Sequence, residues 1–201
     1  MKLYYMPGAC SLVIHIALRE AGVTPQLIKL NPQTGDTDDG GNIKTINTKG
    51  YVPVLVDEDG EKHTEVVAIS LMLADKFADS NLLPTNLKQR RRAIEWLAFV
   101  STEIHKLFGP FFVPDATDAD RRTALVKIEK QFDYADKYLD GKNGFLFSDE
   151  FTVADIYLFV TLFWTTPAQI SLEKWQNLIA FVGRGMQRPA VFEAIKAEGL
   201  I

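Results

Sequence analysis

The sequence lacks several features that mark special classes of protein. It has one cysteine, Cys10, in 201 residues, so no internal disulfide can form. No stretch has the roughly 20 consecutive apolar residues that cross a bilayer, and nothing resembling a signal peptide precedes the first apolar segment. We therefore expect a protein of the cytoplasm with no membrane partner.

Positive charge is also scarce. The chain has 22 Lys and Arg against 26 Asp and Glu, a net charge of -4. Its one dense basic run, Arg90-Arg91-Arg92, fits the solvated start of a helix. Because nucleic-acid binding needs clustered Lys and Arg, we expect no nucleic-acid partner. The sequence also lacks the Cys/His spacing of a metal site, a phosphate-binding glycine loop and a catalytic triad signature.

The first part of the chain alternates short strands with helices. Residues 2–6 predict a strand that ends at Pro7-Gly8, residues 10–22 a helix that ends at Gly22, and residues 26–30 a strand, which together indicate a parallel βαβ unit. After a polar connection with a short helix near residues 43–46, we predict a strand at 52–56, a return strand at 61–64 and a helix at 65–77. The β-α-β and β-β-α order predicts one α/β domain over residues 1–79.

The rest of the chain predicts only helices. A linker at residues 80–87 leads to an all-helical domain at 88–201. One apolar stripe runs from Ile94 through Leu97, Ser101 and Ile104 to Phe108 and stops at Gly109-Pro110; a second runs from Leu125 to Leu139. Thr152 and Asp155 have the spacing of a helix cap and its acidic partner. Two more helices are predicted at 172–186 and 190–197.

The cysteine is the first candidate for chemistry. Cys10 follows the turn-like run Met6-Pro7-Gly8-Ala9 and begins a predicted helix, where free N–H groups and the helix dipole stabilise a thiolate. A free cysteine can also be a small buried hydrophobic residue with no chemical role. From position alone both interpretations stay open.

The whole chain resembles the bacterial beta class of glutathione transferases. The residues that carry the resemblance are Met1-Lys2-Leu3-Tyr4-Tyr5 with Pro7–Leu12, Asn47–Pro53, Thr64-Glu65 with Ala68-Ile69, Glu95-Trp96-Leu97 with Thr102–Lys106, Phe151–Asp155, and Arg188-Pro189 with Glu198-Gly199-Leu200. The resemblance implies an N-terminal thioredoxin-like domain, a C-terminal helical bundle and a homodimer. It also implies a detoxifying transferase that conjugates glutathione, its co-substrate, to hydrophobic electrophiles, with peroxidase or thiol–disulfide exchange through Cys10.

The resemblance also implies roles for individual residues. Cys10 and His105 would be catalytic. The glutathione-binding residues would be Tyr51, Val52, Pro53, Glu65, Val66 and Glu103. Pro53 would be a cis proline that leaves the main chain of Val52 for the cysteinyl part of glutathione. Ser11 and Tyr5 are alternative activators, and we assign His15 and His63 to structure or solvent. Residues 4–9, the segment 108–112 and Trp164 would line an electrophile pocket, although domain core or dimer contact fits Phe108, Phe111 and Phe112 equally.

Three positions depart from the pattern of this class. Gly35, in an acidic loop, stands where the class commonly has a lysine for the glycine carboxylate; Lys44 or Lys49 would have to compensate. Val66 replaces a small residue, and Ala98 replaces a polar one. These departures motivate an alternative function, that of a non-catalytic ligand-binding or adaptor protein with weakened glutathione affinity. A third option is a thiol-transferase with little conjugation activity.

Overall fold

The computed structural model describes all residues, 1–201, in two compact units. Met1–Leu83 and Arg188–Ile201 form the first unit, and Pro84–Gln187 form the second. The linker predicted at residues 80–87 includes the point, between Leu83 and Pro84, where the two units divide. The prediction that residues 88–201 form one helical domain differs at its end, because the last helix packs on the first helix of the chain and joins the N-terminal unit.

The first unit has the predicted β-α-β and β-β-α order. Its elements are β1 (Lys2–Tyr5), α1 (Ser11–Glu20), β2 (Gln26–Lys29), α2 (Ile43–Ile46), β3 (Val54–Val56), β4 (Lys62–Thr64), α3 (Val66–Lys76), the short 3₁₀ turn η1 (Ala78–Ser80) and α9 (Pro189–Ala197). The four strands form one sheet in the order β2-β1-β3-β4. β1 and β2 are parallel, as the βαβ unit predicts, and the other pairs are antiparallel.

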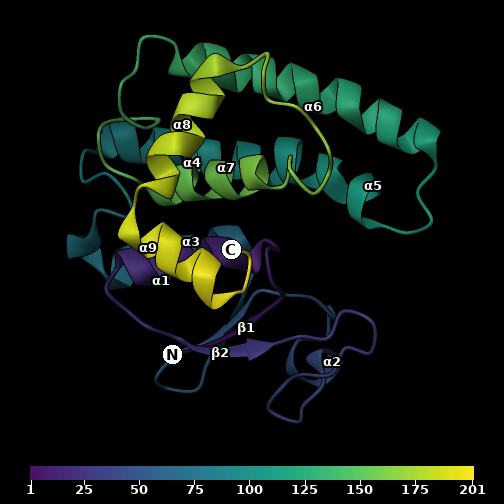
Figure 1. Ribbon diagram of the computed structural model, residues 1–201. Coiled ribbons are helices and arrows are strands. Elements are labelled where there is room, and N and C mark those ends of the chain that lie inside the picture. Colours follow the sequence, from purple (N-terminus) through teal and green to yellow (C-terminus); the bar gives the residue numbers. More distant parts are fainter. The chain divides into compact units, whose positions relative to one another are not determined.

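Alternation along the strands divides the core between the two faces of the sheet. Leu3 on β1 faces α1, and both Leu3 and its β3 partner Leu55 are completely buried. Tyr4 and Val54 point to the opposite face, where Ile43 of α2 joins their cluster. Figure 1 shows α1, α3 and α9 together on one face of the sheet and α2 apart from them. A period of two residues therefore accounts for the layers.

Glycine ends α1 where the sequence predicts. Gly22 has φ 76°, and the N–H of Val23 donates to the carbonyl of Leu18 at 2.8 Å, which closes the helix in a left-handed cap. All residues from Ser11 to Leu18 are buried, because α3 and α9 both pack on α1. The first helix is thus a fixed support for the loop that precedes it.

The second unit consists only of helices. Its elements are α4 (Leu87–Phe99), the π-helical turn η2 (Val100–Ile104), the 3₁₀ turn η3 (His105–Phe108), α5 (Gly109–Phe112), α6 (Asp118–Leu139), α7 (Val153–Phe163) and α8 (Gln176–Met186). The stripe predicted on α6 is buried at Ile128, Phe132, Ala135 and Leu139. The side chain of Asn86 accepts hydrogen bonds from the N–H groups of Lys88 and Gln89, so α4 begins earlier than its apolar stripe.

The stripe predicted from Ile94 to Phe108 is only partly correct. Ile94 is exposed, whereas Leu97, Ile104 and Phe108 are buried. The π turn at Val100–Ile104 adds a residue to one turn and shifts the buried face relative to a regular α-helix. Gly109-Pro110 does not stop the helical chain; it begins α5, since proline is tolerated in a first turn.

The cap predicted at Thr152 is present and completely buried. The carboxylate of Asp155 accepts hydrogen bonds from the N–H of Thr152 at 2.9 Å and from the N–H of Leu146 at 2.7 Å. Burial raises the pKa of Asp155 to about 6, partly offset by the hydrogen bonds from Thr152 and Leu146. This carboxylate therefore ties the start of α7 to the loop before it.

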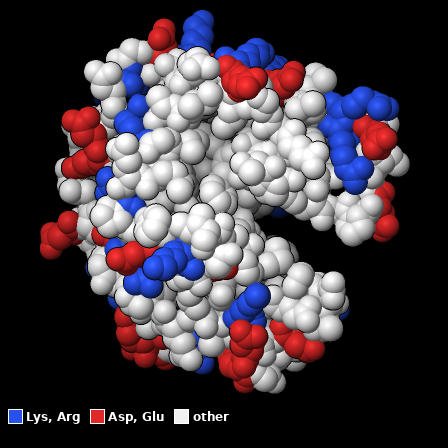
Figure 2. Space-filling view, viewed as in Figure 1, with Lys and Arg blue, Asp and Glu red and all other residues white.

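The surface carries charges of both signs. On the face shown in Figure 2, Lys and Arg side chains lie in small groups next to Asp and Glu side chains. None of the helices has the length and apolar character that a bilayer crossing requires.

Candidate functional site

The thiol lies where the sequence places it, at the N-terminus of α1. Cys10 is the N-cap residue and is partly exposed. Its Sγ lies 3.5 Å from the carbonyl oxygen of Val52, to which the S–H donates. The thiol is therefore not fully buried in the core. It contacts the bend at Val52–Pro53, which lies 42 residues after Cys10 in the sequence.

The alternative activators are used elsewhere. The hydroxyl of Ser11 is fully buried and closes the preceding turn, because it accepts from the N–H of Met6 and donates to its carbonyl, both at 3.2 Å. Tyr5 is buried, and its pKa is raised by that burial and by the charge of Glu198. Both side chains are therefore buried, whereas Cys10 is partly exposed.

The segment before Pro53 is shaped by its own hydrogen bonds. The Val52–Pro53 peptide bond is cis, as the resemblance implies. The side-chain amide of Asn47 donates to the carbonyl of Tyr51 at 2.7 Å, and its oxygen accepts from the N–H of Lys49 at 3.1 Å. These contacts fix the main chain of residues 47–53 beside Cys10.

Glu65 is hydrogen-bonded to the same segment. Its Oε1 accepts hydrogen bonds from Lys49 Nζ at 2.6 Å and from the hydroxyl of Tyr51 at 2.9 Å. The hydrogen bond to Glu65 is the main cause that raises the pKa of both Lys49 and Tyr51. Val66, the first residue of α3, is buried. The structure therefore brings together six predicted residues in one part of the N-terminal unit: Cys10, Tyr51, Val52, Pro53, Glu65 and Val66.

The backbone of Glu65 adds a second indication of function. Its φ is 72°, in the region that residues with a side chain seldom adopt. A residue kept in such a conformation costs on the order of 1 kcal/mol or more, and such residues cluster at functional sites. A glycine would adopt this angle more readily, so the side chain of Glu65 is retained against a conformational cost.

The acidic loop around Gly35 uses part of its charge internally. Asp39 accepts from the hydroxyl of Tyr4 at 2.8 Å and from that of Thr37 at 2.6 Å, and both contacts lower the pKa of Asp39. Lys49, considered above as a substitute for the missing lysine of this loop, is paired with Glu65 instead. The loop thus keeps ionised carboxylates at the position where a basic residue was expected.

The second catalytic candidate, His105, belongs to the helical unit. Its Nδ1 lies 2.6 Å from the hydroxyl of Tyr157, a buried residue of α7. Burial, with a smaller effect from Lys106, lowers the pKa of His105 to about 4. The imidazole is therefore neutral at pH 7, so one ring nitrogen is a donor and the other an acceptor. Glu103 is exposed on the π turn just before it.

This lowered pKa predicts a pH dependence of stability. An unfolded histidine takes up a proton below pH about 6.5, whereas folded His105 stays neutral down to about 4. The unfolded state therefore gains protons first, and stability falls as the pH drops through this window. At pH 5 the wild type should lose about 2 kcal/mol more of its unfolding free energy, relative to pH 7, than the variant His105→Gln.

Urea denaturation of both proteins at the two pH values measures this difference. The carboxyl of Asp155, which titrates in the same window with the opposite sign, is common to both proteins and cancels. Equal losses in the two proteins would contradict a neutral, buried His105.

Aromatic residues surround His105 within the helical unit. The ring of Trp164 lies 4.8 Å from His105 and 5.5 Å from Phe108, between ring centroids, and the ring of Phe112 lies 6.0 Å from Trp164. Phe112 is half exposed, whereas Phe108 and Trp164 are buried. The segment 108–112 and Trp164, two of the parts predicted to line an apolar pocket, are thus in contact, with Phe112 as the exposed residue.

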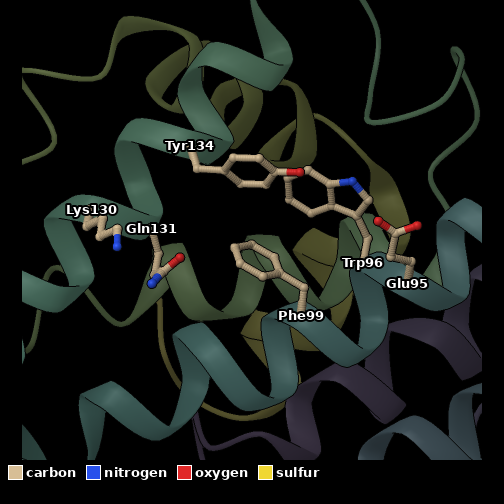
Figure 3. Close-up of a pocket in the computed structure, with 6 residues that line it drawn as sticks. All are labelled: Glu95, Trp96, Phe99, Lys130, Gln131 and Tyr134. Carbon is tan, nitrogen blue, oxygen red and sulfur yellow. The ribbon is translucent and has the colours of Figure 1, made fainter.

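A groove that the sequence did not indicate lies between α4 and α6. It encloses about 340 Å³ and is lined by Glu95, Trp96, Phe99, Lys130, Gln131 and Tyr134. Figure 3 shows the rings of Trp96, Phe99 and Tyr134 close together, with Lys130 and Gln131 on the other side. The groove depends on how two helices align, which periodicity within either helix does not predict.

One cluster of side chains could hold a cation. Asp57, Glu61 and His63 place ligand atoms within 4.8 Å of one another on the β3–β4 hairpin. His63 Nε2 already pairs with Asp57 Oδ2 at 2.8 Å, and Asp57 Oδ1 accepts from the N–H groups of Asp59 and Glu61. These bonds account for the cluster as a brace of the hairpin turn, and we assign no metal to it.

Known proteins are similar to this chain over its whole length. Family models described as the N-terminal and the C-terminal domain of glutathione S-transferase match residues 8–76 and 99–189. Glutathione S-transferase GstA of Escherichia coli O157:H7 is 40% identical over 201 residues, 100% of both chains. The beta-class enzyme of Sphingomonas chungbukensis has a TM-score of 0.94 at 41% identity, with full coverage of both chains. A sphingomonad glutathione S-transferase, solved with glutathione, has a TM-score of 0.93 at 39% identity, again over both whole chains.

Proposed function

Because this chain belongs to the glutathione S-transferase family, we propose that it conjugates glutathione to hydrophobic electrophiles and that Cys10 takes part in the sulfur chemistry. The observation that carries the proposal is the contact of Cys10 Sγ with the Val52 carbonyl, directly before a cis proline. The relatives with matching folds carry the name of this activity, and one was solved with glutathione bound.

Glutathione presents an ammonium, two carboxylates, peptide groups and a thiol. We assign its cysteinyl peptide group to the main chain of Val52, in the manner of an added strand. The γ-glutamyl carboxylate is assigned to the N-terminus of α3, where the N–H of Val66 lies, and the γ-glutamyl ammonium to Glu65. Tyr51 holds the Glu65 carboxylate in place through its hydroxyl. The exposed residue Glu103 is assigned to the glutathione bound by the other subunit of a homodimer.

The reaction needs a thiolate. In conjugation, the glutathione thiol loses its proton, its sulfur attacks the electrophilic carbon, a C–S bond forms, and the leaving group departs with its electron pair. We propose that Cys10 and neutral His105 act on this sulfur by hydrogen bonding, His105 also by moving the proton. In the exchange reaction, the Cys10 thiolate attacks a glutathione disulfide and expels a glutathione thiolate. Reduction of peroxides would use glutathione as the reductant.

The same proposal covers the setting in which the protein works. A homodimer in the cytoplasm that removes reactive apolar compounds fits the family and the single cysteine of the sequence. Phe112, half exposed beside Trp164, supplies apolar surface that suits such compounds. Light scattering in solution, which should give twice the mass of one chain, tests the dimer.

A glutathione titration of the wild type and of Cys10→Ala tests the function. The wild type should be retained on a glutathione resin and should turn over a model aryl halide. We expect Cys10→Ala to bind glutathione within about threefold of the wild type, because the main-chain contacts remain, but to lose tenfold or more, on the order of 1.4 kcal/mol, in turnover or disulfide exchange.

Two outcomes would overturn parts of this proposal. A wild-type protein that neither binds the resin nor turns over the aryl halide would favour the alternative of a binding protein without catalysis. A Cys10→Ala variant with unchanged conjugation and unchanged exchange would remove Cys10 from the chemistry and leave His105 as the active group. Mass spectrometry of a Cys10–glutathione disulfide, combined with no conjugation by the wild type, would favour a thiol-transferase.

A further inference from the structure

A buried carboxylate from the last residues of the chain reaches the loop that carries the thiol. The side chain of Glu198 is completely buried. Its Oε2 accepts a hydrogen bond from the N–H of Gly8 at 2.9 Å, and its Oε1 lies 2.9 Å from His15 Nδ1. The two contacts cross 190 and 183 residues of sequence. One side chain thus joins the end of α9 to both sides of Cys10.

The tail also restricts the loop by packing. A Cβ atom placed on Gly8, whose φ is 71°, would meet the side chain of Leu200 at 3.3 Å. The turn that follows is closed by the N–H of Ala9, which donates to the carbonyl of Met6 at 3.0 Å, and by Ser11. The segment between Met6 and Cys10 is therefore held at two points. Ser11 of α1 is hydrogen-bonded to Met6, and the tail residues Glu198 and Leu200 contact Gly8.

The contacts of this pair fit one arrangement of donors and acceptors. We take His15 Nδ1 as the donor to Glu198, so that the carboxyl group accepts from both of its partners. Nε2 of His15 is buried and has no hydrogen-bond partner, which suits a bare lone pair better than an N–H. The carboxyl group thus accepts two hydrogen bonds inside the protein, one from each side of Cys10 in the sequence.

We propose that Glu198 is a positioning residue for Cys10. By holding the N–H of Gly8, it fixes the turn that sets Cys10 at the N-terminus of α1, with Sγ against the Val52 carbonyl. Its two hydrogen bonds go to Gly8 and His15, on either side of Cys10 in the sequence, so we expect its loss to act first on the position of the thiol. This inference rests on the proposed function only for the role of Cys10. The hydrogen bond between Glu198 and Gly8, called the clamp below, is measured separately by amide hydrogen exchange.

Glu198→Ala removes both hydrogen bonds. Amide hydrogen exchange of the peptide that contains Gly8 should become at least tenfold faster, while the peptides of β3 and β4 keep their rates. With glutathione as substrate, we expect kcat to fall about tenfold, since small displacements of a reacting group cost this much or more. The KM for glutathione should change by less than about twofold, because an interaction made only in the transition state affects kcat and leaves substrate binding unchanged.

Glu198→Gln separates position from charge. Its amide oxygen can accept from the N–H of Gly8, and its NH₂ group can donate to His15 Nδ1 once the imidazole proton moves to Nε2. We expect this variant to recover most of the wild-type kcat at some cost in stability. Should Glu198→Ala fail to fold, Glu198→Asp, whose side chain is one methylene shorter and cannot span both contacts, provides the weakened clamp.

A matched control loosens the same helices away from the thiol. Arg188 pairs with Glu20 at the other end of α1, through Nε at 2.6 Å and NH2 at 2.8 Å. Arg188→Gln should lower stability but leave kcat and the exchange of Gly8 unchanged. The proposal is overturned if Glu198→Ala keeps the wild-type kcat, or if kcat falls equally in Glu198→Gln or Arg188→Gln. Faster exchange at Gly8 in a protein without glutathione turnover would retain the clamp and overturn the proposed function.

Discussion

Replacing Asp155 with alanine should lower the free energy of unfolding by about 4 kcal/mol, a large fraction of the 5–15 kcal/mol typical of a folded protein. The carboxylate accepts the N–H groups of Leu146 and Thr152 in a fully buried setting. Alanine leaves both donors without partners, at about 1–3 kcal/mol each, and removes a helix cap worth about 1 kcal/mol.

Urea denaturation at pH 7 measures this effect. Burial raises the pKa of Asp155 to about 6, so the carboxyl is still mostly ionised at that pH. Asp155→Asn is the matched control: its amide oxygen keeps one N–H partner, but its NH₂ group faces the other donor, so about half of the loss should remain. A loss below about 1 kcal/mol in Asp155→Ala would show that water or another group replaces the carboxylate.

Local signals in the sequence predicted this cap and most of the N-terminal unit. The spacing of Thr152 and Asp155 encodes a contact between near neighbours, which a single sequence can reveal. In the same way, Pro7-Gly8 and Gly22 bound the first helix and place Cys10 at its start. These features depend on backbone conformations that one or two residue types supply.

Features that depend on distant partners could not be predicted in this way. Glu198 was part of a tail known only by resemblance, and its contact with Gly8 requires α9 to pack on α1. The π turn before His105 shifts the helical register, and no residue type marks such a turn. The pairing of Lys49 with Glu65 likewise depends on how the segment 47–53 folds against the start of α3.

The pairing at Glu65 leads to the second large effect. Its carboxylate is held by Lys49 and Tyr51, and its backbone keeps a φ of 72°. If the γ-glutamyl ammonium also binds there, Glu65→Gln loses a charge-assisted hydrogen bond worth about 1.5–3 kcal/mol, so glutathione affinity should fall about 10- to 100-fold. Stability should change little, because the side chain is exposed and surface ion pairs contribute about 0–1 kcal/mol.

Calorimetric titration with two ligands identifies the atom involved. Glu65→Gln should weaken binding of glutathione but not of an analogue that lacks the γ-glutamyl amine, because that analogue has no ammonium to donate a hydrogen bond to Glu65. Tyr51→Phe removes only the hydroxyl that holds the carboxylate, and we expect a loss of about two- to fivefold for glutathione, about 0.5–1 kcal/mol. Equal losses for both ligands in Glu65→Gln would instead mean that Glu65 shapes the start of α3 and does not contact the ammonium.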